Sequence, residues 1–205
     1  MLDQLKREAA ALGKKEWRPV LEYVAALHEK STHPPSPPFS RPWEEIGPGY
    51  CYAPAFGHWD LVHQILDVLP SEPEHARDQI LNNLENQQDD GLVPGSIWLG
   101  GDAPRWSPEV GHPPVWPIAV SDYCDLTGSD ELAALCYESL LKQIGWFESH
   151  RRAEDEGYYY LDIVNRSWES GIDEGVRFDD VQAGRLACVD ATSPGSYTHL
   201  TLPTN

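Results

Sequence analysis

The stretch SDELAALCYESLLKQIGWFESHRR, residues 129–152, decides the fold class. It predicts one long helix, with Ser129 or Asp130 as its N-cap. An acidic turn, EDEG, follows it, and the chain then enters the extended stretch GYYYLDIV (157–164). A long helix with this exit is typical of one arm of a helical hairpin.

Four more segments of the chain predict helices. Segment 3–30 carries leucine, alanine and valine at helical spacing, with a kink or break at Pro19. Segment 71–90 opens on a capping-box pattern formed by Ser71 and Glu74. The other two are GHWDLVHQILDVL (57–69) and PPVWPIAVSDYCDLTG (113–128). Five helical segments without a run of alternating strands predict an all-α fold.

Two junctions between predicted elements look alike. QDDGLVP (88–94) and EDEGYYY (154–160) both end a helix with acidic residues and glycine, and both run into large apolar residues. Each is followed by a long loop. We therefore expect helical hairpins whose long loops gather at one end of the molecule.

The overall composition limits the possible partners. The chain has 205 residues, of which 40% are hydrophobic and 23% are charged, as in folded proteins. Its net charge of -18 argues against nucleic acid and anionic membranes, because both are polyanions. No apolar run approaches the roughly 20 residues of a membrane span. The start, MLDQLKREAAALGKKEW, has no apolar signal region, which favours the cytoplasm.

The reactive and aromatic residues favour a carbohydrate over a metal or cofactor. The four cysteines form no C-x-x-C pair, and the eight histidines form no ligand set, so we expect no metal and no cofactor. Eight Trp and nine Tyr accompany only four Phe. Trp and Tyr combine a flat apolar face with a polar group, which suits the faces and rims of sugars.

The segment RSWESGIDEGVRFDD (166–180) holds five carboxylates interrupted by two glycines. It resembles the ESG-x-D-x-x-x-R signature of inverting glycosidases of glycoside hydrolase family 63, including mannosylglycerate hydrolase-like enzymes, and of their trehalase relatives. Further stretches are similar in the same order, and the resemblance covers roughly residues 43–182: HWD (58–60), DGLVPG (90–95), HPPVW (112–116) and the helix ending WFESHRR.

The resemblance implies a fold and an activity. It implies the first half of an (α/α)6 toroid with long loops at the active-site end. Asp173 would be the general acid, a carboxyl group whose pKa burial and neighbouring acids would raise. The substrate would be a small saccharide or glycoside, and the resemblance implies that these residues line its site: Trp59, Asp60, His112, Trp116, Glu169 and Arg177.

Each of these residues also has a purely structural interpretation. Asp173 can cap a turn after Gly171, and Trp59 can be a core residue with Asp60 as its exposed neighbour. A helix that starts with proline explains the HPP sequence and leaves only His112 for function. Arg177 can be a salt-bridge partner. The sequence also departs from the family, with EGVR after Asp173 and with His112 where many relatives have Gln, which leaves the sugar open.

The end of the chain differs from the rest. In such relatives a downstream Glu is the general base, and we expect it beyond residue 205, because Asp190 is the only carboxylate between 181 and 205. Residues 193–205 include SYTHLTLPTN, which carries no charge and no helical pattern. We interpret 1–192 as the N-terminal part of one glycosidase domain and 193–205 as a non-native or disordered tail, a sequencing artefact. An ordinary polar tail is the alternative.

The sequence thus predicts a glycoside hydrolase that is inactive without its base. Two other functions stay open. One is a toroid that binds or epimerises sugars without hydrolysis, since fold and pocket can be shared while chemistry differs. The other is a helical interaction scaffold whose aromatic residues form the core.

Overall fold

The computed structural model describes residues 2–47, 54–154, 157–162, 169–172, 185, 187–189 and 191–192. The predicted all-α fold is confirmed as a mainly α fold for this part of the chain, which also contains short strands. It contains a short 3-10 helix at Lys15–Trp17 and six α-helices: α1 (Asp3–Ala11), α2 (Arg18–Ser31), α3 (His58–Val68), α4 (Pro73–Glu85), α5 (Trp116–Thr127) and α6 (Glu131–His150).

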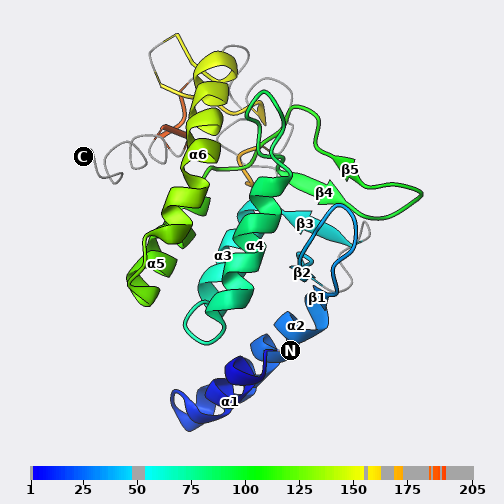
Figure 1. Ribbon diagram of the computed structural model, residues 1–205, viewed down its shortest axis with the longest axis vertical. Coiled ribbons are helices and arrows are strands. Elements are labelled where there is room, and N and C mark those ends of the chain that lie inside the picture. The colour runs from blue at the N-terminus through cyan, green and yellow to red at the C-terminus, as the bar shows by residue number, and fades with distance from the viewer. Residues whose placement is uncertain are drawn as a thin grey trace.

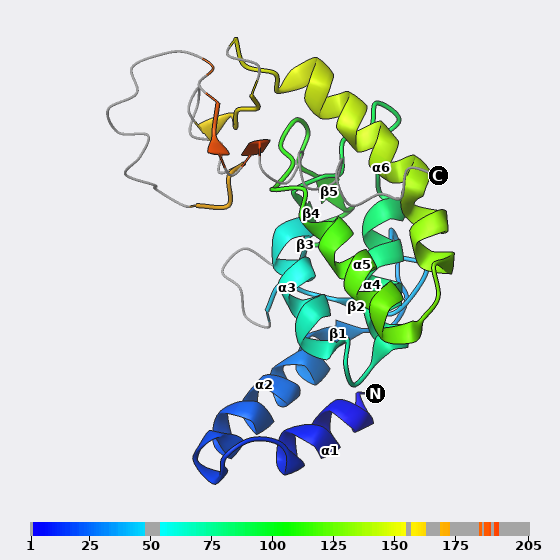
Figure 2. The ribbon, with the colours of Figure 1, turned by 90° about the vertical axis from the view of Figure 1, so that its left-hand side faces the viewer.

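The helices pack as three consecutive pairs, α1 with α2, α3 with α4, and α5 with α6 (Figure 1). Helix α5 also contacts α3 and α4, and α6 contacts α4, so the last two pairs form one group of neighbouring helices. The α1–α2 pair extends away from that group (Figure 2). The loops that precede α3 and α5 and follow α4 and α6 lie at the same end of the helices (Figure 1).

Short strands lie at this loop end. β3 (Ala55–Gly57), β4 (Ser96–Trp98) and β5 (Arg105–Trp106) form an antiparallel sheet in that order, with Phe56 opposite Ile97. β1 (Thr32–His33) pairs with β2 (Trp43–Glu44). β3 leads directly into α3, so the sheet fixes where that helix begins.

The core is built on the apolar stripe of α3, which packs against α4 and α5. Leu61, Ile65 and Val68 have at most 1% of their surface exposed, at the three- and four-residue spacing that keeps side chains on one helical face. Burying each such side chain is worth roughly 1.5–3 kcal/mol. Packing of this stripe therefore holds α3 against α4 and α5.

Two expectations about helix starts need correction. Segment 3–30 does break into two helices, but the break lies between Ala11 and Arg18, and Pro19 lies in the first turn of α2, where its missing N–H has no helical partner. Ser71 does not cap α4, which begins at Pro73. Its hydroxyl donates a hydrogen bond to Glu8 of α1, a partner that no local pattern indicates.

A buried charge network joins the first two helix pairs. Glu44 is 1% exposed and binds His28 Nδ1 of α2 at 2.6 Å and His75 Nε2 of α4 at 3.0 Å. Burial favours a higher pKa for Glu44, but the hydrogen bonds from the two histidines outweigh it and leave the pKa lowered. Burial likewise favours a lower pKa for His28, but Glu44 and Asp67 outweigh it and leave the pKa raised.

In the described part of the chain, every helix is too short or too polar to cross a membrane.

Candidate active site

The ESG turn is held by the carboxylate of Glu169, which is fully buried. Arg151, the residue after α6, donates from Nε to Oε2 at 2.8 Å and from Nη2 to Oε1 at 2.8 Å. The backbone N–H groups of Gly111 (3.2 Å) and Leu161 (2.7 Å) donate to the same carboxylate. Burial raises the pKa of Glu169, against the effect of Arg151 and the two N–H groups. Glu169 thus has its oxygens occupied by protein donors.

The backbone of the same turn is bound by a second carboxylate. Asp162 is 4% exposed, and it accepts the N–H of Glu169 at 2.5 Å and the N–H of Ser170 at 2.6 Å. Ser170 Oγ in turn accepts the N–H of Ile172 at 3.1 Å. Each residue of the turn except Gly171 therefore has its backbone N–H bound to a side chain. Such a turn is preorganised.

The turn packs against the start of α3 through Gly171 and Trp59. Gly171 has a φ of +70°, in the left-handed region that glycine adopts without strain. A Cβ at this position would overlap the six-membered ring of Trp59. Trp59 is half-buried and donates from Nε1 to His63 Nε2 at 2.6 Å. The HWD and ESG motifs, far apart in sequence, are therefore in contact.

The DGLVPG and HPP motifs lie beside each other. Gly95 donates its N–H to the carbonyl of Val110 at 2.8 Å, and a Cβ on Gly95 would lie 2.8 Å from Cδ2 of His112. Since Gly111 binds Glu169, His112 is one residue from the ESG network. The structure thus brings His112, Trp59 and the ESG turn to the loop end of α3, α5 and α6.

The other predicted site residues differ in how far they are exposed to solvent, and two of them lie outside the described residues. Asp60 is exposed on the first turn of α3. Trp116 is 2% exposed in the core and donates from Nε1 to Gln143 at 2.6 Å, which favours a structural role over sugar contact. The full burial of Glu169 favours the same. Asp173 and Arg177 lie outside the described residues, so their roles stay predictions.

Arg151 is the residue of this network that sequence reasoning misses. It is 4% exposed, and its guanidinium carbon lies 4.4 Å from the ring centroid of Trp146. Nη1 donates to the carbonyl of His150 at 3.0 Å, and Nη2 donates to that of Glu109 at 2.5 Å. The sequence marks Arg151 only by its position at the end of the long helix, and Arg152 has the same position. Arg152 instead pairs with Glu148 on the surface.

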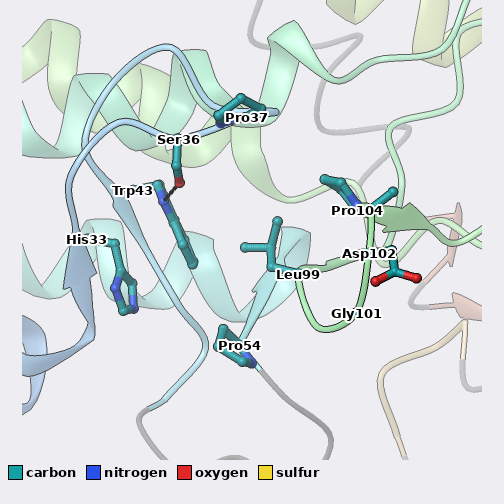
Figure 3. Close-up of a pocket in the computed structure, with 10 residues that line it drawn as sticks. His33, Ser36, Pro37, Trp43, Pro54, Leu99, Gly101, Asp102 and Pro104 are labelled. Carbon is teal, nitrogen blue, oxygen red and sulfur yellow. Dashed lines mark hydrogen bonds between the residues drawn. The ribbon is translucent and has the colours of Figure 1, made fainter.

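A cavity of about 290 Å³ lies elsewhere, between β2 and the loop at residues 99–104. Figure 3 shows Trp43, Leu99 and Asp102 around it, with the Trp43 indole N–H on Ser36 Oγ at 3.0 Å. None of the predicted sugar-site residues that the structure describes lines this cavity. Among the described residues, His, Cys, Asp and Glu form no group of three suited to a metal ion.

Comparison with known proteins agrees with the motifs. A model of the "mannosylglycerate hydrolase MGH1-like glycoside hydrolase domain" family matches residues 53–198. Two curated proteins of Selaginella moellendorffii, mannosylglycerate hydrolases MGH2 and MGH1, are each 26% identical over 141 residues. The match covers 62% of this chain and 29% of each relative, so the chain spans less than a third of their length. No solved structure matches the chain. The family resemblance is confirmed.

Proposed function

This chain belongs to the mannosylglycerate hydrolase MGH1-like glycoside hydrolase domain family, and on that basis we propose that it is the N-terminal part of an inverting glycosidase. The fold we propose for the complete domain is an (α/α)6 toroid. The chain supplies the general acid and part of the sugar site, and the general base lies beyond residue 205.

The proposed reaction is a single displacement at the anomeric carbon. Asp173 donates its proton to the glycosidic oxygen as the bond to the leaving group breaks. A second carboxylate takes a proton from a water molecule, which attacks the opposite face of the sugar. Inverting enzymes hold these two carboxyl groups roughly 6.5–9.5 Å apart, which leaves room for the water.

The observation that carries the proposal is the contact of the four motifs. The ESG turn, the HWD helix start, and the DGLVPG and HPP segments meet at one end of the helices, although up to about 110 residues separate them in the sequence. A helical scaffold needs no such gathering of polar loop motifs. Preorganised polar groups at one end of a helical array are what a catalytic site needs.

Exposed apolar side chains support the larger toroid. Leu126 on α5 is 51% exposed, and Leu135 and Leu141 on α6 are 56% and 42% exposed. Further helices packed beside α5 and α6 would bury these side chains. The share of the relatives that the chain covers, 29%, agrees with a longer parent.

The substrate class we propose is a small α-linked mannoside or glucoside. The two relatives are named for mannosylglycerate, so this compound is the first probe. The half-buried ring of Trp59 would pack on an apolar sugar face. His112 and Asp60 would bind hydroxyl groups, Asp60 through charge-assisted hydrogen bonds.

The test combines binding with turnover. The purified chain is titrated with mannosylglycerate by isothermal calorimetry, and NMR follows the anomeric configuration of any released sugar. We expect saturable binding without turnover by the chain, and turnover with inversion by the longer product of the same gene. Hydrolysis by the 205-residue chain would contradict the missing base. Binding without hydrolysis by the longer product would favour the sugar-binding alternative, and no binding by either would favour the scaffold.

A further inference from the structure

We propose that Arg151 is a positioning residue of this site, which by way of Glu169 holds the ESG turn that precedes Asp173 and the backbone that precedes His112. This inference rests on the proposed function for the roles of Asp173 and His112. The role of Arg151 itself rests on contacts among described residues.

Arg151 and Glu169 form a bidentate ion pair, in which the guanidinium donates hydrogen bonds to both carboxylate oxygens. Nε lies 2.8 Å from Oε2 and 3.0 Å from Oε1, and Nη2 lies 2.8 Å from Oε1. The two side chains are 5% and 0% exposed, so water does not compete for these bonds. The plane of the Arg151 guanidinium is fixed by the Trp146 ring beneath it and by the carbonyls of His150 and Glu109, to which it donates hydrogen bonds. Arg151 therefore holds Glu169 in one orientation.

The Arg151–Glu169 pair is connected through the backbone to two predicted site residues, Asp173 and His112. In the sequence, Asp173 directly follows Ile172, the last described residue of the ESG turn. On the other side, Glu169 binds the N–H of Gly111, the residue before His112. A rotation of the Glu169 carboxylate would therefore move the attachment points of Asp173 and His112 together.

Lysine is a poor replacement for arginine in this network. Its ammonium is a compact charge, whereas the contacts here need three donors in one plane and a flat face on Trp146. Arg151→Lys keeps the charge that compensates Glu169, so the fold does not have to bury an unpaired carboxylate. The neighbouring Arg152, which forms an exposed pair with Glu148, gives the matched control Arg152→Lys.

The first readout needs no ligand. Amide hydrogen exchange is measured in the 205-residue chain and in both lysine variants. In Arg151→Lys we expect the amides of Gly111 and Leu161, which Glu169 holds, to exchange about tenfold faster or more. The Arg152→Lys chain should match the wild type. Equal effects of the two variants, or a rise at all amides together, would overturn the proposal, because either result describes a general loss of stability.

The second readout is a double-mutant cycle on the dissociation constant for mannosylglycerate. If Arg151 acts through Asp173, Arg151→Lys weakens binding about tenfold in the wild-type chain but has little further effect after Asp173→Asn. Independent, additive effects would reject this route. A wild-type chain that binds no mannosylglycerate would count against the proposed function, and the exchange result would still decide whether Arg151 holds the turn.

Discussion

Replacing Gly171 by alanine is expected to open the ESG turn without unfolding the helices. The residue has a φ of +70°, and its Cα faces the ring of Trp59, so alanine meets two separate obstacles. Gly47 offers a matched control, because its Cβ position has no heavy atom within 4 Å and its φ is not in the left-handed region.

The size of the effect follows from the two obstacles. Left-handed backbone costs a residue with a Cβ roughly 1–2 kcal/mol. Forcing a methyl group against a packed ring costs roughly 1–3 kcal/mol. The turn should therefore lose about 2–5 kcal/mol, which corresponds to a population of open turns at least about thirtyfold larger.

Amide exchange at Glu169 and Ser170 measures this opening, because Asp162 holds both amides only in the closed turn. We expect both to exchange at least about thirtyfold faster in Gly171→Ala. In a Trp59→Ala background the added cost should fall to roughly 1–2 kcal/mol, since only the backbone strain is left. Exchange within threefold, on the order of 0.7 kcal/mol, of the Gly47→Ala control would refute the described turn.

Three further predictions concern stability and reactivity. The lowered pKa of Glu44 stabilises the fold above pH 4.5 and the raised pKa of His28 stabilises it below pH 6.5, so the free energy of unfolding lost in His28→Gln should be largest between these values. Urea unfolding at several pH values checks this, and a loss that is independent of pH would contradict it. Gly145→Ala, at an exposed site inside α6 with no heavy atom within 4 Å of its Cβ position, should raise the unfolding free energy by roughly 0.5–1 kcal/mol in the same assay; a decrease would show an unrecognised role for this glycine. Burial raises the pKa of Cys136 to about 12, so its alkylation at pH 8, followed by mass spectrometry, should be at least about a hundredfold slower than in the urea-unfolded chain, and equal rates would contradict its burial.

The parts of the fold that local spacing determines could be predicted from the sequence. Helices α3, α5 and α6 appear where their apolar residues recur at helical intervals, because a helix buries one face whatever lies beyond it. The strands were missed because each has two or three residues and depends on a distant partner. Phe56 pairs with Ile97, a relation that neither segment shows alone.

For the candidate site too, one part could be predicted from the sequence and another could not. Motif order predicted that HWD, HPP and ESG belong to one site, and Trp59 and Gly171 are in contact. Residue type could not distinguish a sugar contact from a structural residue, so Trp116 and Glu169 were predicted as ligands although both are buried. Arg151 could not be identified, because its role depends on a partner 18 residues away and on the burial of both side chains.

The His28–Glu44–His75 network shows that the folded unit extends beyond the range that matches the family model. The family match begins at residue 53, after Glu44 and after the whole α1–α2 pair. A chain trimmed to the family boundary would leave His75 on α4 without the carboxylate that it binds. It would also leave Gln79, whose amide oxygen accepts the N–H of Glu44, with an unfilled bond in the interior. The segment before residue 53 therefore completes the interior of the matched domain, and the two should be expressed and engineered as one unit.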